Sequence, residues 1–272
     1  MSDIVVSLTE IQRLKEELNT LNEEYIKLYE KMEDLKKEKE YFESLYMCKL
    51  GALIFLRFEN EIKYRRLKKK LILIVKSKNK GEEINIEEIE RVLEKELEEF
   101  YRDLDELRNN LKNSQEFLEL PILTEEEVKK VKEIFRSLAK ILHPDVNKNL
   151  NEEMMELWLK VKEAYENNDL MTLIILEGII KQNEFKADIK VISIEENISI
   201  LKKKINELKN FIDEEENSFP LNIKELIDDN EYIKDKKQEI TNDIHEYERM
   251  ITEVEKSISE VLEEKSYVIF SS

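Results

Sequence analysis

Acid–base chemistry in this chain could begin at His143, which is followed directly by Pro144 and Asp145. An imidazole beside a carboxylate can act as a general base that the carboxylate orients. Such a base also needs a nucleophile or a metal-bound water, and neither is arranged near it in the sequence. The only other histidine, His245, lies on the outer side of a long heptad pattern, where we expect a plain surface residue. We therefore expect that the protein is not an enzyme.

Cofactor and metal chemistry is also disfavoured. The single cysteine, Cys48, excludes an intrachain disulfide and a multi-cysteine zinc site. The chain has only 3 glycines and no glycine-rich loop of the kind that cradles phosphates. We expect no cofactor and no metal, and we expect Cys48 to be a small buried hydrophobic residue.

A basic stretch precedes the histidine. Between Val128 and Leu142 five residues are basic and only Glu133 is acidic. The whole chain has 45 basic and 63 acidic residues and a net charge of -18. A run of charge is usually a solvated helix face, but this one is opposite in sign to the protein. The basic residues are Lys129, Lys130, Lys132, Arg136 and Lys140.

Two predicted helices position this loop. Thr124 and Glu127 have the spacing of a capping box, which marks the start of the first helix. Pro144 disfavours helical geometry at the residue before it, so that helix should end at the histidine. Asn149 or Asn151 can cap the second helix, and a short further helix should follow at 170–180. The apolar faces expected to form the core of this module include Phe135, Leu138, Leu142, Trp158, Val161 and Tyr165.

This arrangement resembles the J-domain of DnaJ-type co-chaperones, which consists of a helix, a His-Pro-Asp loop and another helix. Phe135-Arg136, Leu138-Ala139 and His143-Pro144-Asp145 fall at the family's spacing, and so does Trp158-x-x-Val161-x-x-Ala164-Tyr165. The matching part covers about a quarter of the chain. The resemblance therefore implies a J-domain-like module over residues 121–186.

The resemblance also implies a partner and a role for each residue. J-domains dock on the ATPase lobe and interdomain linker of a DnaK-type chaperone and stimulate its ATP hydrolysis. The five basic residues would form the electrostatic docking face, which mainly speeds and orients association. Asp145 would accept charge-assisted hydrogen bonds from a chaperone arginine. Pro144 would keep the loop rigid, and His143 would position it.

The chain also departs from the family pattern. The segment 117–122 lacks the glycine of the turn that follows the family's first helix, and the end of the preceding long helix could take that helix's place. Ile141 stands where the family often has lysine or arginine. The glycine/phenylalanine-rich linker, the cysteine-rich zinc module and a β-rich substrate domain are missing. The chain thus resembles the divergent class that keeps the J-domain alone and joins it to other elements.

Those other elements are predicted to be coiled coils, so the expected fold is all-α. Apolar residues repeat in steps of three and four, a period typical of a helix packed along another helix. The partner of each seam could be a second copy or another part of the chain. The first seam comprises Ile11, Leu14, Leu18, Leu21, Tyr25, Leu28, Met32 and Leu35. We expect an N-terminal coiled-coil helix at 1–49, an antiparallel hairpin at 50–120, the J-like module at 121–186 and a C-terminal coiled-coil hairpin at 187–272.

Two functions follow as expectations. The first is a J-domain co-chaperone or adaptor that recruits a DnaK-type chaperone, while its coiled-coil arms bind an unknown client or self-associate as a homo-oligomer. The alternative is a structural coiled-coil scaffold whose J-like domain no longer stimulates ATP hydrolysis. The strong negative charge argues against nucleic acid and anionic membrane as partners. No apolar run approaches the roughly 20 residues that span a bilayer, and we expect a cytoplasmic protein.

Overall fold

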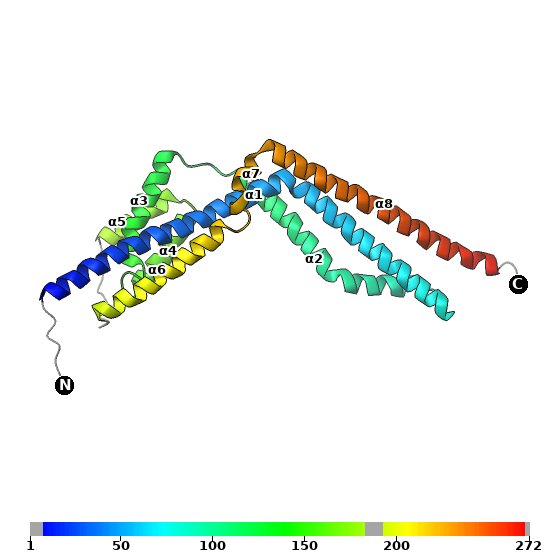
Figure 1. Cartoon of the computed structure of the whole chain (residues 1–272), viewed down its shortest axis with the longest axis horizontal. Coiled ribbons are helices and arrows are strands. Elements are labelled where there is room, and N and C mark those ends of the chain that lie inside the picture. Colours follow the sequence, from blue (N-terminus) through cyan, green and yellow to red (C-terminus); the bar gives the residue numbers. More distant parts are fainter. Residues whose placement is uncertain (1–7, 183–192, 270–272) are drawn as a thin grey trace, which may run out of the picture. The chain divides into compact units, whose positions relative to one another are not determined.

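The computed structural model describes residues 8–182 and 193–269, and within these ranges it confirms the all-α prediction (Figure 1). The described residues form eight α-helices and one short 3₁₀ helix, η1, with no strand among them. The bounds are α1 Leu8–Lys80, α2 Ile86–Leu118, α3 Glu125–Leu142, α4 Glu152–Glu166, α5 Leu170–Gln182, α6 Ile194–Glu216, η1 Leu221–Ile223, α7 Lys224–Asp228 and α8 Asn230–Ile269.

The helices form two compact units, each built from separate stretches of sequence. Unit 1 contains residues up to 40 together with 121–222, and unit 2 contains 41–120 together with the residues from 223 onward. The helix α1 contributes to both units. This division differs from the expected boundary at residue 50, which falls inside α1 because no proline interrupts the helix there. The expected boundary at 186–187 lies outside the described residues.

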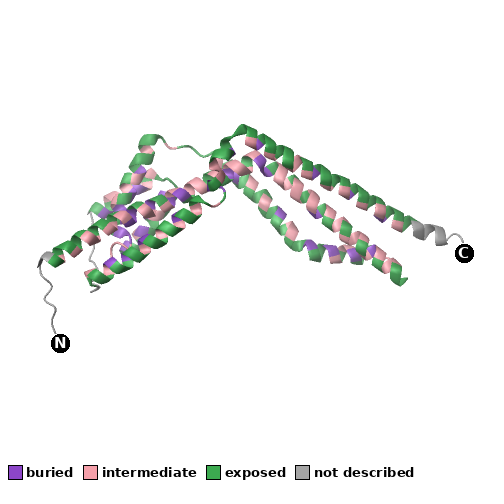
Figure 2. Ribbon diagram, in the orientation of Figure 1, coloured by how far each residue is buried: buried purple, intermediate pink, exposed green. Residues whose placement is uncertain are grey.

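Unit 1 holds the core around the histidine loop. The helices α3, α4 and α5 pack on one another, and their buried side chains include Phe135, Trp158 and Leu173. The first part of α1 contributes Ile26 to this core. Buried residues lie along α1 and along the helices of the module (Figure 2). A second cluster joins Tyr25 of α1 to α6. The first heptad seam is therefore occupied by another part of the same chain.

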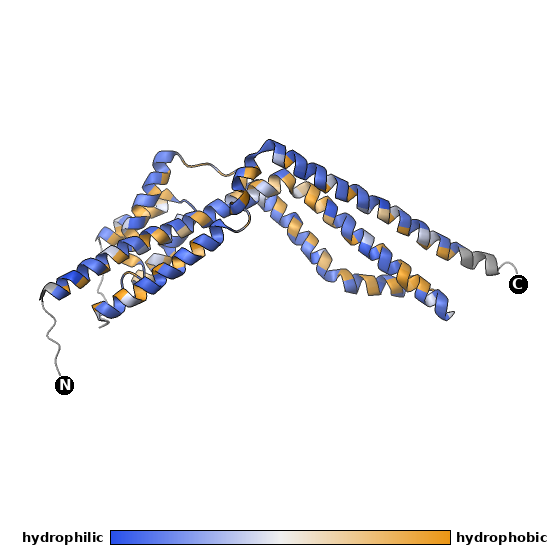
Figure 3. Ribbon diagram, in the orientation of Figure 1, coloured by the Kyte–Doolittle hydropathy of each residue, from blue (hydrophilic) through white to orange (hydrophobic). Residues whose placement is uncertain are grey.

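Unit 2 is built on the remainder of α1, with α2 and α8. Hydrophobic and hydrophilic residues are interspersed along these long helices (Figure 3). Their shared core contains Ile74 of α1, Leu93 of α2 and Ile258 of α8. Gly81, which follows α1, has a φ of 69° and supplies the left-handed geometry of the turn toward α2.

Two single-residue expectations have different outcomes. Cys48 is exposed, so the expectation of a buried cysteine is wrong, because the residue lies on a face of α1 that other helices leave uncovered. His245 is exposed on α8, as expected. No described helix combines the length and the apolar character needed to cross a membrane.

Candidate functional site: the histidine loop of unit 1

The local sequence fixes the position of the loop between α3 and α4. The helix α3 begins with the predicted capping box, in which the Glu127 carboxylate accepts from the Thr124 amide at 2.8 Å and the Thr124 hydroxyl accepts from the Glu127 amide at 3.3 Å. The helix ends at Leu142, and His143 has an extended backbone with φ -72° and ψ 125°. This is the geometry that the following proline favours. Asn151 caps α4 by accepting from the Met154 amide at 2.8 Å.

The loop is held by hydrogen bonds within itself. The His143 carbonyl accepts from the amides of Val146 at 3.0 Å and Asn147 at 2.8 Å. The imidazole Nδ1 of His143 accepts from the Asp145 amide at 3.1 Å, so this nitrogen carries no proton. Lys148 Nζ donates to the Pro144 carbonyl at 3.0 Å. The His-Pro-Asp turn is thus an ordered feature that ties its own side chains to its backbone.

His143 is a buried residue, with 4% of its surface exposed. Its ring lies edge-on to Tyr29, Trp158 and Tyr25, with centroids 4.5, 4.7 and 5.0 Å away. Burial lowers the pKa of His143 to about 4, although Asp145 opposes this shift. The imidazole is therefore neutral at neutral pH. Its ring packs between Tyr25 and Tyr29 of α1 and Trp158 of α4.

Asp145 is half-buried, and its carboxylate is already hydrogen-bonded. Tyr25 Oη of α1 donates to Asp145 Oδ2 at 2.6 Å, and Lys148 Nζ lies 3.6 Å from Oδ1. Burial raises the pKa of Asp145, but the Tyr25 hydrogen bond and the charges of Lys148 and Lys204 are among the effects that outweigh it, so the pKa lies below its usual value. Burial and the Asp145 hydrogen bond raise the pKa of Tyr25, which keeps the phenol protonated as a donor.

The basic residues of α3 separate into two groups. Lys132 Nζ lies 2.6 Å from Asp34 Oδ2, and Lys140 Nζ lies 3.5 Å from Glu23 Oε1. Arg136 binds Glu30 through two nitrogens, with Nη2 at 2.8 Å from Oε1, and this hydrogen bond raises the Arg136 pKa. All three acidic partners belong to α1. Lys129 and Lys130, by contrast, are exposed, and the charge of Lys130 acts on Glu127 of its own helix, where it helps to lower the pKa of that carboxyl.

The sequence did not predict the part that α1 plays at this site. Tyr25, Ile26 and Tyr29 pack against the module, with Tyr29 stacked 6.3 Å from Phe135. The end of α2 was expected to take the place of a first helix; the long helix whose residues join the core of the module is α1. Leu120 and Ile122, which follow α2, are 59% and 93% exposed. The available signal was that Ile26 and Tyr29 lie beside the heptad seam, which gives α1 a second apolar face.

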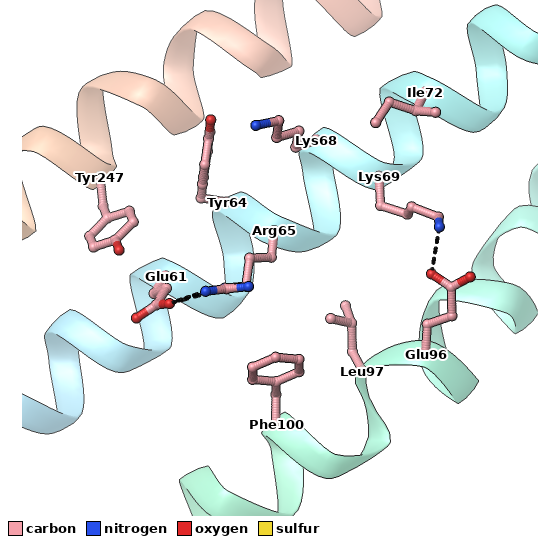
Figure 4. A pocket seen from close by; sticks show the side chains of 10 residues that line it. All are labelled: Glu61, Tyr64, Arg65, Lys68, Lys69, Ile72, Glu96, Leu97, Phe100 and Tyr247. Atoms are coloured by element: carbon pink, nitrogen blue, oxygen red, sulfur yellow. Dashed lines mark hydrogen bonds and ion pairs between the residues drawn. The ribbon is translucent and has the colours of Figure 1, made fainter.

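A separate groove of about 490 Å³ lies in unit 2, between α1, α2 and α8 (Figure 4). Its lining is aromatic and basic, but its charged groups are mostly paired with one another. Arg65 binds Glu61 at 2.7 Å, and Lys69 binds Glu96 at 2.8 Å. These pairs satisfy the groups that could otherwise bind a ligand. None of the residues expected at the site lies here.

Among the described residues, no cluster of three or more histidine, cysteine, aspartate or glutamate side chains is arranged to hold a metal ion. The described site consists of a hydrogen-bonded turn, a buried neutral imidazole, a hydrogen-bonded carboxylate and a basic helix face. Comparison with known proteins found no family model, no curated protein and no solved structure that matches this chain.

Proposed function

We propose that this protein is a J-domain co-chaperone or adaptor that recruits a DnaK-type chaperone and stimulates its ATP hydrolysis. The observation that carries the proposal is the ordered His-Pro-Asp turn at the tip of the α3–α4 hairpin, next to a basic face on α3. We call His143, Pro144 and Asp145, together with Lys132, Arg136 and Lys140, the docking face. Lys129 and Lys130 extend it toward the start of α3.

Each group on the docking face has chemistry suited to this role. The carboxylate of Asp145 is an acceptor for a cationic donor on the chaperone, since charge-assisted hydrogen bonds are short and strong. The positive face of α3 complements an acidic surface and would steer a partner toward it. His143 is packed rather than reactive, which agrees with a loop that binds and does not catalyse. The coiled-coil helices would then select a client or an assembly.

A single-turnover ATPase assay with the host's DnaK-type chaperone tests the proposal. We expect the wild type to accelerate hydrolysis and Asp145→Asn to abolish the acceleration, because the amide lacks the charge of the carboxylate. His143→Gln should do the same by moving the loop. Matched controls are Asp103→Asn and His245→Gln, which change exposed residues outside the docking face. Equal acceleration by the wild type and Asp145→Asn would contradict the proposal.

A structural coiled-coil scaffold is the second candidate function. It is favoured by one observation, namely that Asp145 and Arg136 already have partners on α1. A scaffold of this kind needs no chaperone and predicts no acceleration by the wild type or by any variant of α1 or α3. The same assay therefore separates the two candidates.

A further inference from the structure

The face that would receive the chaperone is covered by part of the chain itself. Three acidic residues of α1, Glu23, Glu30 and Asp34, form what we call the acidic stripe. They pair with Lys140, Arg136 and Lys132 of α3 respectively. The order of the partners is reversed, so the two helices present complementary charges in antiparallel register. Glu23, Glu30 and Asp34 are separated by seven and four residues, and Lys132, Arg136 and Lys140 by four and four, so each set lies on one face of its helix.

The tip of the hairpin is covered as well. Tyr25 Oη donates to Asp145 Oδ2 at 2.6 Å, which occupies one of the two oxygens of the carboxylate. Tyr25 and Tyr29 flank the His143 ring, and Tyr29 also lies 5.9 Å from the Trp158 ring. One helix therefore supplies acidic partners for the basic face and a donor for the carboxylate. A docking surface on another protein would have to offer the same chemistry.

We infer that α1 is an intramolecular latch, in which its acidic stripe and Tyr25 occupy the docking face and hold the module in a closed state. This inference rests on the proposed function. A DnaK-type chaperone must then replace α1 with its own carboxylates opposite Lys132, Arg136 and Lys140 and its own donor to Asp145. When the competent state is a minor one, apparent affinity falls by the fraction that is open.

The other charged face of α1 allows the latch to be tested without loosening the whole helix. Glu17 and Glu24 pair with Lys202 and Lys209 of α6, at 2.7 and 2.6 Å, and lie away from α3. Glu16 is an exposed residue of the same helix. Neutralising these three side chains removes as much charge from α1 as neutralising the acidic stripe, but leaves the contacts with α3 in place.

The latch variant is Glu23→Gln/Glu30→Gln/Asp34→Asn, and the control is Glu16→Gln/Glu17→Gln/Glu24→Gln. Both are titrated into the single-turnover assay with the host's DnaK-type chaperone. We expect the latch variant to reach half-maximal stimulation at about a tenfold lower concentration than the wild type, and the control to match the wild type. Adding Asp145→Asn to the latch variant should abolish the stimulation.

Trp158 provides a readout that does not need the chaperone. It is the only tryptophan of the chain and contacts both Tyr29 and His143. Release of α1 should increase the quenching of its fluorescence by acrylamide in the latch variant and not in the control. If circular dichroism shows that the latch variant is unfolded, Tyr25→Phe replaces it. That variant keeps the ring, removes the donor to Asp145 and should shift the stimulation curve in the same direction.

Each outcome identifies which statement fails. Equal stimulation by the wild type, the latch variant and Tyr25→Phe would overturn the latch and leave the co-chaperone function standing. Weaker stimulation by folded latch variants would also overturn it, because α1 would then support the docking face and not obstruct it. No stimulation by any of them would overturn the proposed function, and the latch would fall with it.

Discussion

At the scale of single residues, His143 shows how packing decides chemistry. Its neighbour Asp145 could raise its basicity, as a catalytic pair requires, but enclosure by Tyr25, Tyr29 and Trp158 outweighs that effect and favours the neutral ring. Lys148 of the loop, Lys162 of α4 and Lys204 of α6 add to the same shift. The folded state therefore favours the uncharged form of the His143 imidazole over the protonated form.

Because the pKa of His143 is lower in the folded state than its ordinary value, the stability of unit 1 depends on pH. The folded pKa of about 4 lies below the ordinary value of 6.5, so the stabilising effect is complete above pH 6.5 and is lost as pH falls toward 4. The loss amounts to at most about 3 kcal/mol. Urea unfolding followed by Trp158 fluorescence should show a steeper acid dependence for the wild type than for His143→Gln. Matching slopes would contradict the burial argument, and His245→Gln should behave as the wild type.

At the scale of elements, local signals in the sequence predicted helix ends well. The capping residues Thr124 and Asn151 and the stop before Pro144 are found where their chemistry places them. Such signals act within a few residues and need no knowledge of the fold. The packing of Tyr25 and Tyr29 against the module could not be predicted in the same way. It joins positions more than a hundred residues apart, and the heptad seam alone does not say which helix occupies the second face of α1.

Two glycines, one inside a helix and one in a turn, should change stability in opposite directions when each is replaced by alanine. Gly178 lies inside α5, and a Cβ added there would meet nothing within 4 Å. Gly178→Ala should therefore stabilise unit 1 by about 0.5–1 kcal/mol, because alanine is the better helix former. Gly81 has open space too, but its φ of 69° strains any L side chain. Gly81→Ala should destabilise unit 2 by about 1 kcal/mol. Thermal unfolding of both variants checks the pair, and stabilisation by both would contradict the backbone argument for Gly81.

At the scale of the whole molecule, long heptad seams need not mean association between copies. The seam of α1 that includes Leu18, Leu21, Tyr25 and Leu28 is filled by Leu201, Ile205 and Leu208 of α6. Ion pairs also join α1 to α6, including Lys31 with Glu216 at 2.7 Å and Lys39 with Glu215 at 2.8 Å. In unit 2, residues of α2 and α8 pack in the same manner against Leu67, Leu71 and Ile74 of α1. The apolar stripes that typically drive coiled-coil dimers are thus satisfied within one chain.

The net charge of -18 adds repulsion between copies to these filled seams. We therefore expect light scattering coupled to size exclusion to give the mass of a monomer, 32.7 kDa, at low and moderate salt.

An exposed apolar stripe on α5, formed by Met171, Ile174, Ile175 and Ile179, is too small to hold a stable dimer, which needs about 800 Å² from each partner. Met171→Lys/Ile175→Lys should accordingly leave the measured mass unchanged. A dimer mass for the wild type that falls to the monomer value in this variant would show that α5, and not the heptad seams, joins two copies.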